Sequence, residues 1–303
     1  MGNQNAIIAT TDVRLIIDMV LNSVTSEHSK RAYEKALTDF MTWWREQDKP
    51  PMVKATVQEY KVRLENSGLS PSTVNQRMSA IRKLANEAAD NGLMSQEIAN
   101  GIGKVKGMKQ NGERIGNWLD RDQAQKLINA PDTSTLKGLR DRAILAVMVG
   151  AGLRRSEVAE LTFDCIQQRE VRWVIVDMAG KGNRIRTVPL PSWAKLAIDE
   201  WVSALGANGG YMFRPMNKGG KVTGDKVSSQ LVYRVVAEYA GEDIAAHDLR
   251  RTFAKLAHKG GAPVDQIQLS LGHASLRTTE RYLGLEQDLT DAPCDHLGLR
   301  LED

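Results

Sequence analysis

Residues 171–190, VRWVIVDMAGKGNRIRTVPL, mark the point at which a helical sequence changes to strand. The apolar-rich runs 171–178 and 185–190 flank the turn AGKGNR at 179–184, which is the pattern of an antiparallel hairpin. On both sides of the hairpin, apolar residues recur every three to four positions, as in amphipathic helices. Such helices are expected at 120–130, 137–150, 155–162, 192–204, 227–240, 247–259, 263–271 and 275–283. Residues 118–283 are therefore predicted to form an α+β domain with one small sheet.

The first hundred residues show helical patterns. Apolar residues follow helical spacing in four stretches, of which the fourth begins at Ser70 and Pro71 and stops at Asn91 and Gly92. Four amphipathic helices with short connections are typical of a small bundle, which we expect over residues 1–100. The whole chain is thus predicted to be mainly α with a small antiparallel β-sheet, in two domains.

A basic segment, residues 101–117, separates the two predicted domains and has no apolar period. It is rich in glycine, and Lys104, Lys106, Lys109 and Arg114 are accompanied there by a single acidic residue. A flexible solvated connector and a strap along a phosphate backbone fit this composition equally well.

Positive charge is concentrated in the body of the chain. Residues 118–283 hold 24 Lys and Arg against 18 Asp and Glu, whereas the tail 284–303 holds 1 against 6. A basic body suits a nucleic-acid partner, and an acidic tail is usually solvated.

We expect no membrane span, because no apolar run reaches about 18 residues, and no signal peptide. Cys165 and Cys294 match no metal-ligand spacing, so a reducing compartment is expected.

Two stretches of the second domain carry basic side chains suited to phosphate chemistry. Arg154 directly follows a glycine-rich helix end, where it could clamp a phosphate, and Glu157 could orient its guanidinium. Lys181 lies between two glycines at the hairpin tip, from which it could reach a leaving oxygen. Taken singly, a surface ion pair and a solvated hairpin tip explain these two residues better.

Two further stretches lie near the carboxy end. His247 and Arg250 share one face at a helix start and suit an anion such as phosphate, although a capped surface helix fits equally well. His273 and Tyr282 would face opposite sides of one continuous helix. Gly272, as a helix C-cap, supplies the break that lets both face a shared cleft. A half-buried packing tyrosine is the ordinary alternative.

All four stretches together, in this order, resemble the tyrosine recombinase, or phage integrase, family. The matching motifs are AGLRRSE, GKGNRIRTVPL, HDLRR, LGH and TTERYL, and the resemblance extends over nearly the whole chain. It places the family's six active-site positions on Arg154, Lys181, His247, Arg250, His273 and Tyr282. Departures are small: Gly284 stands where the tyrosine motif often has histidine, and Arg155 where an apolar residue is common.

The resemblance implies a site-specific recombinase or integrase that works through a 3′-phosphotyrosyl intermediate and a Holliday junction. Tyr282 would attack phosphorus, His247 would assist its proton transfer, and Lys181 would protonate the leaving oxygen. Arg154 and Arg250 would hold the non-bridging oxygens.

The remaining active-site histidine, His273, would donate a hydrogen bond to the phosphate. No metal ion, other cofactor or ATP is expected in this chemistry.

The partner implied is double-stranded DNA with inverted-repeat core sites, bound by a homotetramer in the cytoplasm, at the bacterial nucleoid. Residues 1–100 would form the core-binding domain, and the tail 284–303 would contact a neighbouring protomer. The basic residues expected to meet DNA are Lys104, Lys106, Lys109, Arg114, Arg184 and Arg251.

Three alternative functions differ from this one in what they would require. A non-catalytic DNA-binding protein on a decayed scaffold would lack one or more of the six residues. A type IB topoisomerase would relax DNA that carries no specific site. A metal-dependent nuclease built on His247 and Asp248 would need acidic partners that the sequence does not place beside them.

Overall fold

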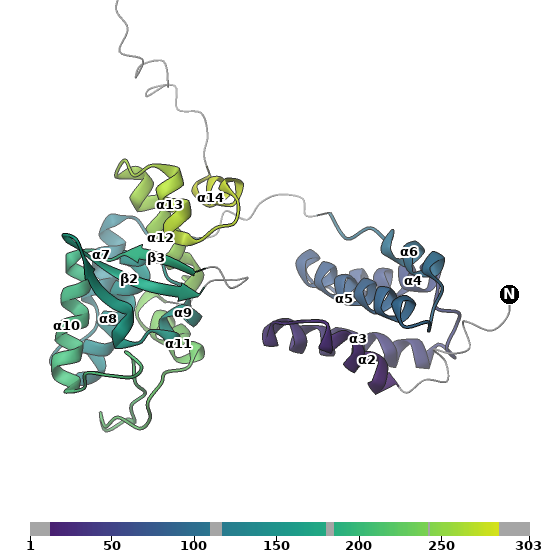
Figure 1. Ribbon diagram of the computed structural model, residues 1–303, viewed down its shortest axis with the longest axis horizontal. Coiled ribbons are helices and arrows are strands. Elements are labelled where there is room, and N and C mark those ends of the chain that lie inside the picture. The colour runs from purple at the N-terminus through teal and green to yellow at the C-terminus, as the bar shows by residue number, and fades with distance from the viewer. Residues whose placement is uncertain (1–12, 110–116, 180–184, 242, 285–303) are drawn as a thin grey trace, which may run out of the picture. The chain divides into compact units, whose positions relative to one another are not determined.

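The computed structural model describes residues 13–109, 117–179, 185–241 and 243–284 (Figure 1). The chain forms two compact units, Met1–Glu113 and Arg114–Asp303, and each has its own hydrophobic core. Both units are mainly helical, and the second contains one small antiparallel sheet, so the predicted fold class is confirmed. Within these ranges, no helix combines the length and apolar character needed to cross a bilayer.

The first unit is a bundle of helices. Its described elements are α2 (Val13–Asn22), α3 (Glu27–Glu46), α4 (Lys54–Asn66), α5 (Pro71–Asp90) and α6 (Gln96–Gly103). The core includes an aromatic cluster in which the ring of Tyr60 lies 4.9 Å from the rings of both Phe40 and Trp43. Four of these helices follow the predicted stretches, and α6 is an additional one.

The sequence predicted a basic segment that begins at residue 101, but the bundle extends beyond this residue. Ile102, in the last turn of α6, is buried in the first core, and so is Val105. The side chain of Asn75 donates to the carbonyl oxygen of Met108 at 3.0 Å and accepts from its N–H at 2.7 Å. The chain up to this point therefore belongs to the bundle. The sequence did not reveal these contacts, because the two buried apolar residues stand among glycines and lysines and form no recognisable helical period.

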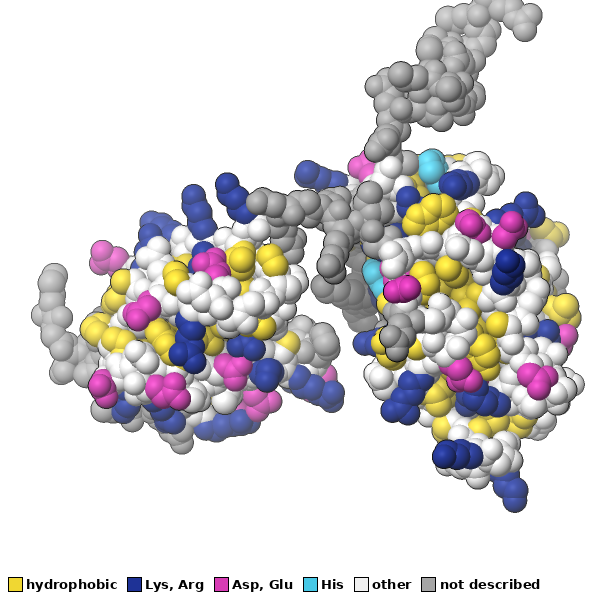
Figure 2. Space-filling view, turned by 180° about the vertical axis from the view of Figure 1, so that it is seen from behind, with side chains coloured by type: hydrophobic (Ala, Val, Ile, Leu, Met, Phe, Trp, Pro, Cys, Tyr) yellow, Lys and Arg dark blue, Asp and Glu magenta, His cyan; other side chains and the backbone are white. Residues whose placement is uncertain are grey.

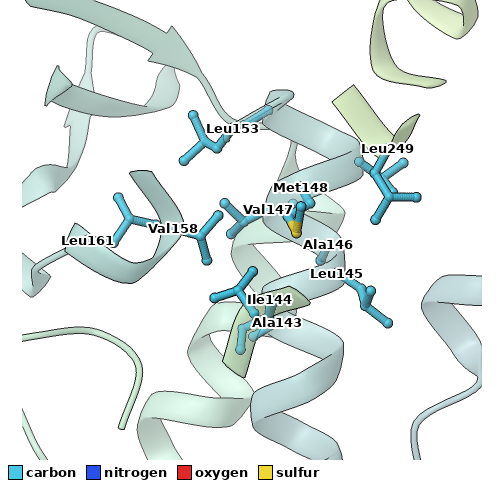
Figure 3. Close-up of a cluster of buried hydrophobic side chains, with 14 of the residues drawn as sticks. Ala143, Ile144, Leu145, Ala146, Val147, Met148, Leu153, Val158, Leu161 and Leu249 are labelled. Carbon is cyan, nitrogen blue, oxygen red and sulfur yellow. The ribbon is translucent and has the colours of Figure 1, made fainter. Parts of the chain in front are cut away.

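The second unit is built around a buried helix. Its helices are α7 (Arg121–Asn129), α8 (Leu136–Ala151), α9 (Arg155–Glu160), α10 (Ser192–Leu205), α11 (Ser229–Ala240), α12 (Ala246–Lys259), α13 (Val264–Leu271) and α14 (Leu276–Leu283). The consecutive residues from Ala143 to Met148 in α8 are all fully buried, and neighbours such as Val158 and Leu249 pack around them (Figure 3). A helix that is apolar on every side needs covering on every side. This requirement places the other elements around α8.

The sheet consists of β1 (Ile166–Arg169), β2 (Arg172–Ala179) and β3 (Ile185–Pro189), in the order β1-β2-β3 with antiparallel pairing. Strands β2 and β3 are the predicted hairpin. The sequence missed β1, because three of its four residues IQQR are polar and exposed and the strand shows no apolar alternation. Ile175 pairs with Ile166 on one side and Val188 on the other, which fixes the register around buried residues.

Two left-handed glycines end the helices that lead into the candidate site. Gly152 caps α8 with φ of +61°, and Gly272 caps α13 with φ of +63°. A Cβ at Gly152 would lie 2.6 Å from Cδ1 of Phe253 and 3.0 Å from Cδ2 of Leu271. Glycine is therefore required at this turn for both its backbone conformation and its lack of a side chain.

We predict that Gly152→Ala lowers the free energy of unfolding by about 2 to 4 kcal/mol, through left-handed strain and overpacking together. Gly206 provides the control, because its φ is +66° and nothing lies within 4 Å of an added Cβ. Gly206→Ala should cost about 1 kcal/mol, from backbone strain alone. Urea denaturation measures both losses, and equal losses would contradict the packing argument.

Candidate active site

The carboxylate of Glu157 contacts the arginine side chains of the site. Arg154, the N-cap residue of α9, donates from its backbone N–H to Oε2 at 2.8 Å and from Nη1 to Oε1 at 2.7 Å. Nη1 of the Arg250 guanidinium lies 4.0 Å from Oε2. Burial alone would raise the pKa of Glu157, but hydrogen bonds from Arg186 and from the Arg154 backbone lower it below its usual range. The carboxylate is therefore ionised at neutral pH.

Arg186 is a member of this cluster that sequence reasoning missed. Its Nη1 and Nη2 donate to the two oxygens of Glu157 at 3.1 and 2.9 Å, and its Nε donates to the carbonyl oxygen of Ser270 at 3.0 Å. A signal was available, because period-two alternation puts Arg186 on the same face of β3 as buried Val188. An arginine at an inward strand position requires such partners.

Arg250 is fully buried and joins two helix ends. Its Nη1 donates to the carbonyl oxygen of Gly152 at 2.6 Å, and its Nη2 donates to that of Leu271. Among the described residues, its buried Nε has no hydrogen-bond partner. Burial first, and then the charge of Arg154, lower the pKa of Arg250 to about 10, so the guanidinium remains charged at neutral pH. It thus brings an incompletely satisfied cation into the site.

Tyr282 lies between the two candidate histidines. Its hydroxyl is hydrogen-bonded to Nε2 of His247, and its ring centroid lies 5.4 Å from that of His247 and 4.8 Å from that of His273. The Arg251 guanidinium, held by Asp248 at 3.0 Å, lies 5.3 Å from the same ring. Burial raises the pKa of Tyr282, although the charges of nearby arginines oppose the rise. The phenol is therefore protonated at neutral pH and needs a base.

Both histidines are neutral in this environment. Burial, followed by the charge of Arg250, lowers the pKa of His247. The same causes, with the added charge of Arg154, lower the pKa of His273 to about 4. A neutral His247 can accept the proton of the Tyr282 hydroxyl that it contacts, and a neutral His273 has one N–H to donate.

The chain break expected between His273 and Tyr282 is present. Gly272 ends α13 in the left-handed conformation, and α14 begins after Ser275. Ser275 starts the helix through its backbone carbonyl, which accepts from the N–H of Thr278 at 3.0 Å, and its hydroxyl makes no capping bond. The two helices are therefore placed so that histidine and tyrosine meet.

The structure thus brings together Arg154, His247, Arg250, His273 and Tyr282, with Glu157 supporting the arginines. Lys181, Arg114 and Arg184 lie outside the residues that the structure describes. Lys104, Lys106 and Lys109 are exposed on the first unit. On the face shown in Figure 2, Lys and Arg side chains are interspersed with Asp and Glu on each unit. Surface charge on that face therefore does not by itself mark a DNA path.

In the described part of the chain, no group of three His, Cys, Asp or Glu side chains could hold a metal ion.

The second unit matches the Phage integrase family over residues 117–288, which is more than half of the chain. The chain belongs to the phage integrase family. Its first unit matches the N-terminal SAM-like domain of phage integrases over residues 14–92. The family resemblance predicted from the sequence is thus confirmed.

Named relatives and solved structures agree with this assignment. Tyrosine recombinase XerC of Pelobacter propionicus is 35% identical over 72% of this chain and 70% of its own length. XerC of Xylella fastidiosa strain M23 is 28% identical over 86% of this chain and 87% of its own. The crystal structure of XerH bound to palindromic difH substrate, a post-cleavage complex, has a TM-score of 0.66 at 19% identity, covering 85% of this chain and 76% of that one.

A lambda integrase dimer bound to a COC′ core site also has a TM-score of 0.66, at 15% identity, and covers 91% of this chain and 78% of that one. At these identities the two structures establish a shared fold.

We predict that Arg186→Lys lowers the free energy of unfolding by about 1 to 3 kcal/mol, because one ammonium cannot replace the guanidinium's bidentate contact and its third hydrogen bond. Arg172→Lys, on the exposed start of the same hairpin, should change it by less than about 0.5 kcal/mol. Urea denaturation of both variants tests this, and equal changes would show that the Arg186 contacts carry no stability.

Proposed function

We propose that this member of the phage integrase family is a site-specific DNA recombinase that cleaves and rejoins strands through a 3′-phosphotyrosyl intermediate and a Holliday junction. One observation carries the proposal: the hydroxyl of Tyr282 is hydrogen-bonded to a neutral His247, in a site whose arginines contact the carboxylate of Glu157. A nucleophile, a base and a set of cations are what an attack on a phosphodiester requires.

In the first step, the phenol is activated by His247. The Tyr282 hydroxyl gives its proton to Nε2 of His247 while its oxygen forms a bond to phosphorus. The bond from phosphorus to the 5′-oxygen breaks, and Lys181 protonates that leaving oxygen. The products are a phosphotyrosyl ester on the 3′ side and a free 5′-hydroxyl on the other.

The negative charge that develops on phosphate is neutralised by fixed donors. Arg154 and Arg250 hold the non-bridging oxygens, and His273 adds a hydrogen bond from its ring. Such a preorganised donor is worth about 2.7 to 4 kcal/mol in a comparable oxyanion site. The Nε of Arg250 supports this role, because it has no hydrogen-bond partner among the described residues and a buried donor without a partner gains most from an arriving anion.

The ester stores the energy of the broken bond. A 5′-hydroxyl from another duplex can therefore reverse the step onto a new partner, and ATP is not required. The arginines and Lys181 provide the positive charge that a metal ion supplies in other phosphoryl-transfer sites.

DNA is the partner of this enzyme, and the finer picture of its binding extends the proposal. Four protomers would assemble on inverted-repeat core sites in the cytoplasm, at the nucleoid. The first unit would form the core-binding domain, residues 118–283 the catalytic domain, and the tail 284–303 would contact a neighbouring protomer. The DNA backbone would be contacted by Lys104, Lys106, Lys109, Arg114, Arg184 and Arg251.

The nucleophile is tested by trapping the covalent product. Incubation with nicked half-site duplexes from the DNA that neighbours its gene should give a protein–DNA adduct that survives denaturation, in EDTA as in magnesium. Tyr282→Phe should abolish the adduct and leave DNA binding unchanged. Tyr233→Phe, at an exposed tyrosine of the same unit, should leave both unchanged. An adduct formed by the Tyr282→Phe protein would overturn the assignment.

The role of His247 predicts how cleavage depends on pH. Burial and the charges of Arg250, Arg251 and Arg154 lower its pKa, against the opposing charge of Asp248, so the ring stays neutral below the usual 6.5. The single-turnover cleavage rate should therefore be maintained at pH 6.5 and fall only in more acidic buffer. A rate that is already halved at pH 6.5 would mean that the base titrates as an ordinary imidazole.

A further inference from the structure

We propose that Thr279 is a positioning residue that fixes the tautomer of His273. The Oγ1 of Thr279 lies 3.0 Å from Nδ1 of the His273 ring. Thr279 is fully buried, although it sits on α14, whose neighbouring residue Thr278 is exposed. The two ring nitrogens of His273 therefore differ in their surroundings, because only Nδ1 contacts this buried hydroxyl.

The direction of the hydrogen bond follows from counting donors. A threonine hydroxyl has one hydrogen to donate, and leaving it unpaired in a buried position is unfavourable. Among the described residues, the Thr279 hydroxyl has no hydrogen-bond partner other than His273. The hydroxyl hydrogen is therefore given to Nδ1, which must carry a lone pair. The ring proton is then on Nε2.

This tautomer matters because His273 holds only one ring proton. Its surroundings, which are burial and the charges of Arg250, Arg154 and Arg186, keep the ring neutral. A neutral imidazole is a donor at one nitrogen and an acceptor at the other. On the proposed function, on which this inference rests, His273 must donate to a phosphate oxygen. An Nδ1–H tautomer would instead present a lone pair at Nε2, which repels that oxygen.

The rest of His273 is already held in place, so the ring is the part that Thr279 controls. The backbone N–H of His273 donates to the carbonyl oxygen of Gln268 at 3.2 Å, and its carbonyl accepts from the Gln268 side chain at 3.1 Å. Thr279 lies three residues before Tyr282 and so shares a helix face with it. When α14 packs in place, it therefore positions the nucleophile Tyr282 and, through Thr279, also fixes which nitrogen of His273 is the hydrogen-bond donor.

The tautomer is measured directly by NMR of the full chain with 15N-labelled histidine, without DNA. The chain has five histidines, so His273→Gln identifies the His273 ring signals by their loss. At neutral pH the wild-type ring should show the Nε2–H pattern of nitrogen shifts. A predominant Nδ1–H pattern would overturn the proposal. This readout does not depend on cleavage, so it separates failure of this inference from failure of the proposed function.

Variants then connect the tautomer to cleavage. Thr279→Val keeps the shape but removes the hydroxyl, and should give a mixed tautomer and an about threefold to tenfold slower single-turnover cleavage. Thr279→Ser should restore both, and Thr278→Val, the same change at the adjacent exposed position, should alter neither. A merely structural role would leave the nitrogen shifts of a folded Thr279→Val protein unchanged, and that result would also overturn the proposal.

Discussion

Glu157 lies among the guanidinium groups of Arg154, Arg186 and Arg250, and the arrangement of the site depends on this one carboxylate. Several cations within a few ångströms repel one another strongly when they are shielded from water. A buried carboxylate offsets part of that repulsion and, through short hydrogen bonds, sets the direction of two of the guanidiniums. One negative charge cannot neutralise three positive ones. The surplus is positive charge that a phosphate could use, and burial together with this surplus keeps both histidines neutral.

Helix ends provide the second support. The last carbonyl groups of a helix have no partner within the helix and attract positive charge. Arg250 occupies such a place twice, because Gly152 caps α8 and Leu271 is the last residue of α13. One buried guanidinium thus joins two helix ends far apart in the sequence. The position of Arg250, and with it the Nε that no described residue satisfies, is determined by the backbone of other elements rather than by α12 alone.

These two supports explain why Tyr282 lies where it does. Leu271 is held by Arg250 and Ser270 by Arg186, so the turn at Gly272 that carries His273 is tied to the cationic cluster. Helix α14 follows from that turn and brings Thr279 and Tyr282 against His273. The Tyr282 phenol, the His247 imidazole and the guanidiniums of Arg154 and Arg250 therefore belong to one connected set of contacts, although they come from α14, α12 and the N-cap of α9.

The sequence by itself determined the hairpin and the described helices other than α6, and it proposed the site residues, because apolar periodicity, glycine caps and short motifs are local properties of the chain. It did not reveal β1, whose polar residues have no periodic signal, or the anchoring of residues 102–108 in the bundle through Asn75. The contacts of Arg186 with Glu157, and of Thr279 with His273, were equally absent from it. Each of these depends on which side chains meet after folding. Only the tertiary structure decides that, because hydrogen bonds between residues 29 or 98 positions apart, as at Arg186 and Arg250, leave no local pattern.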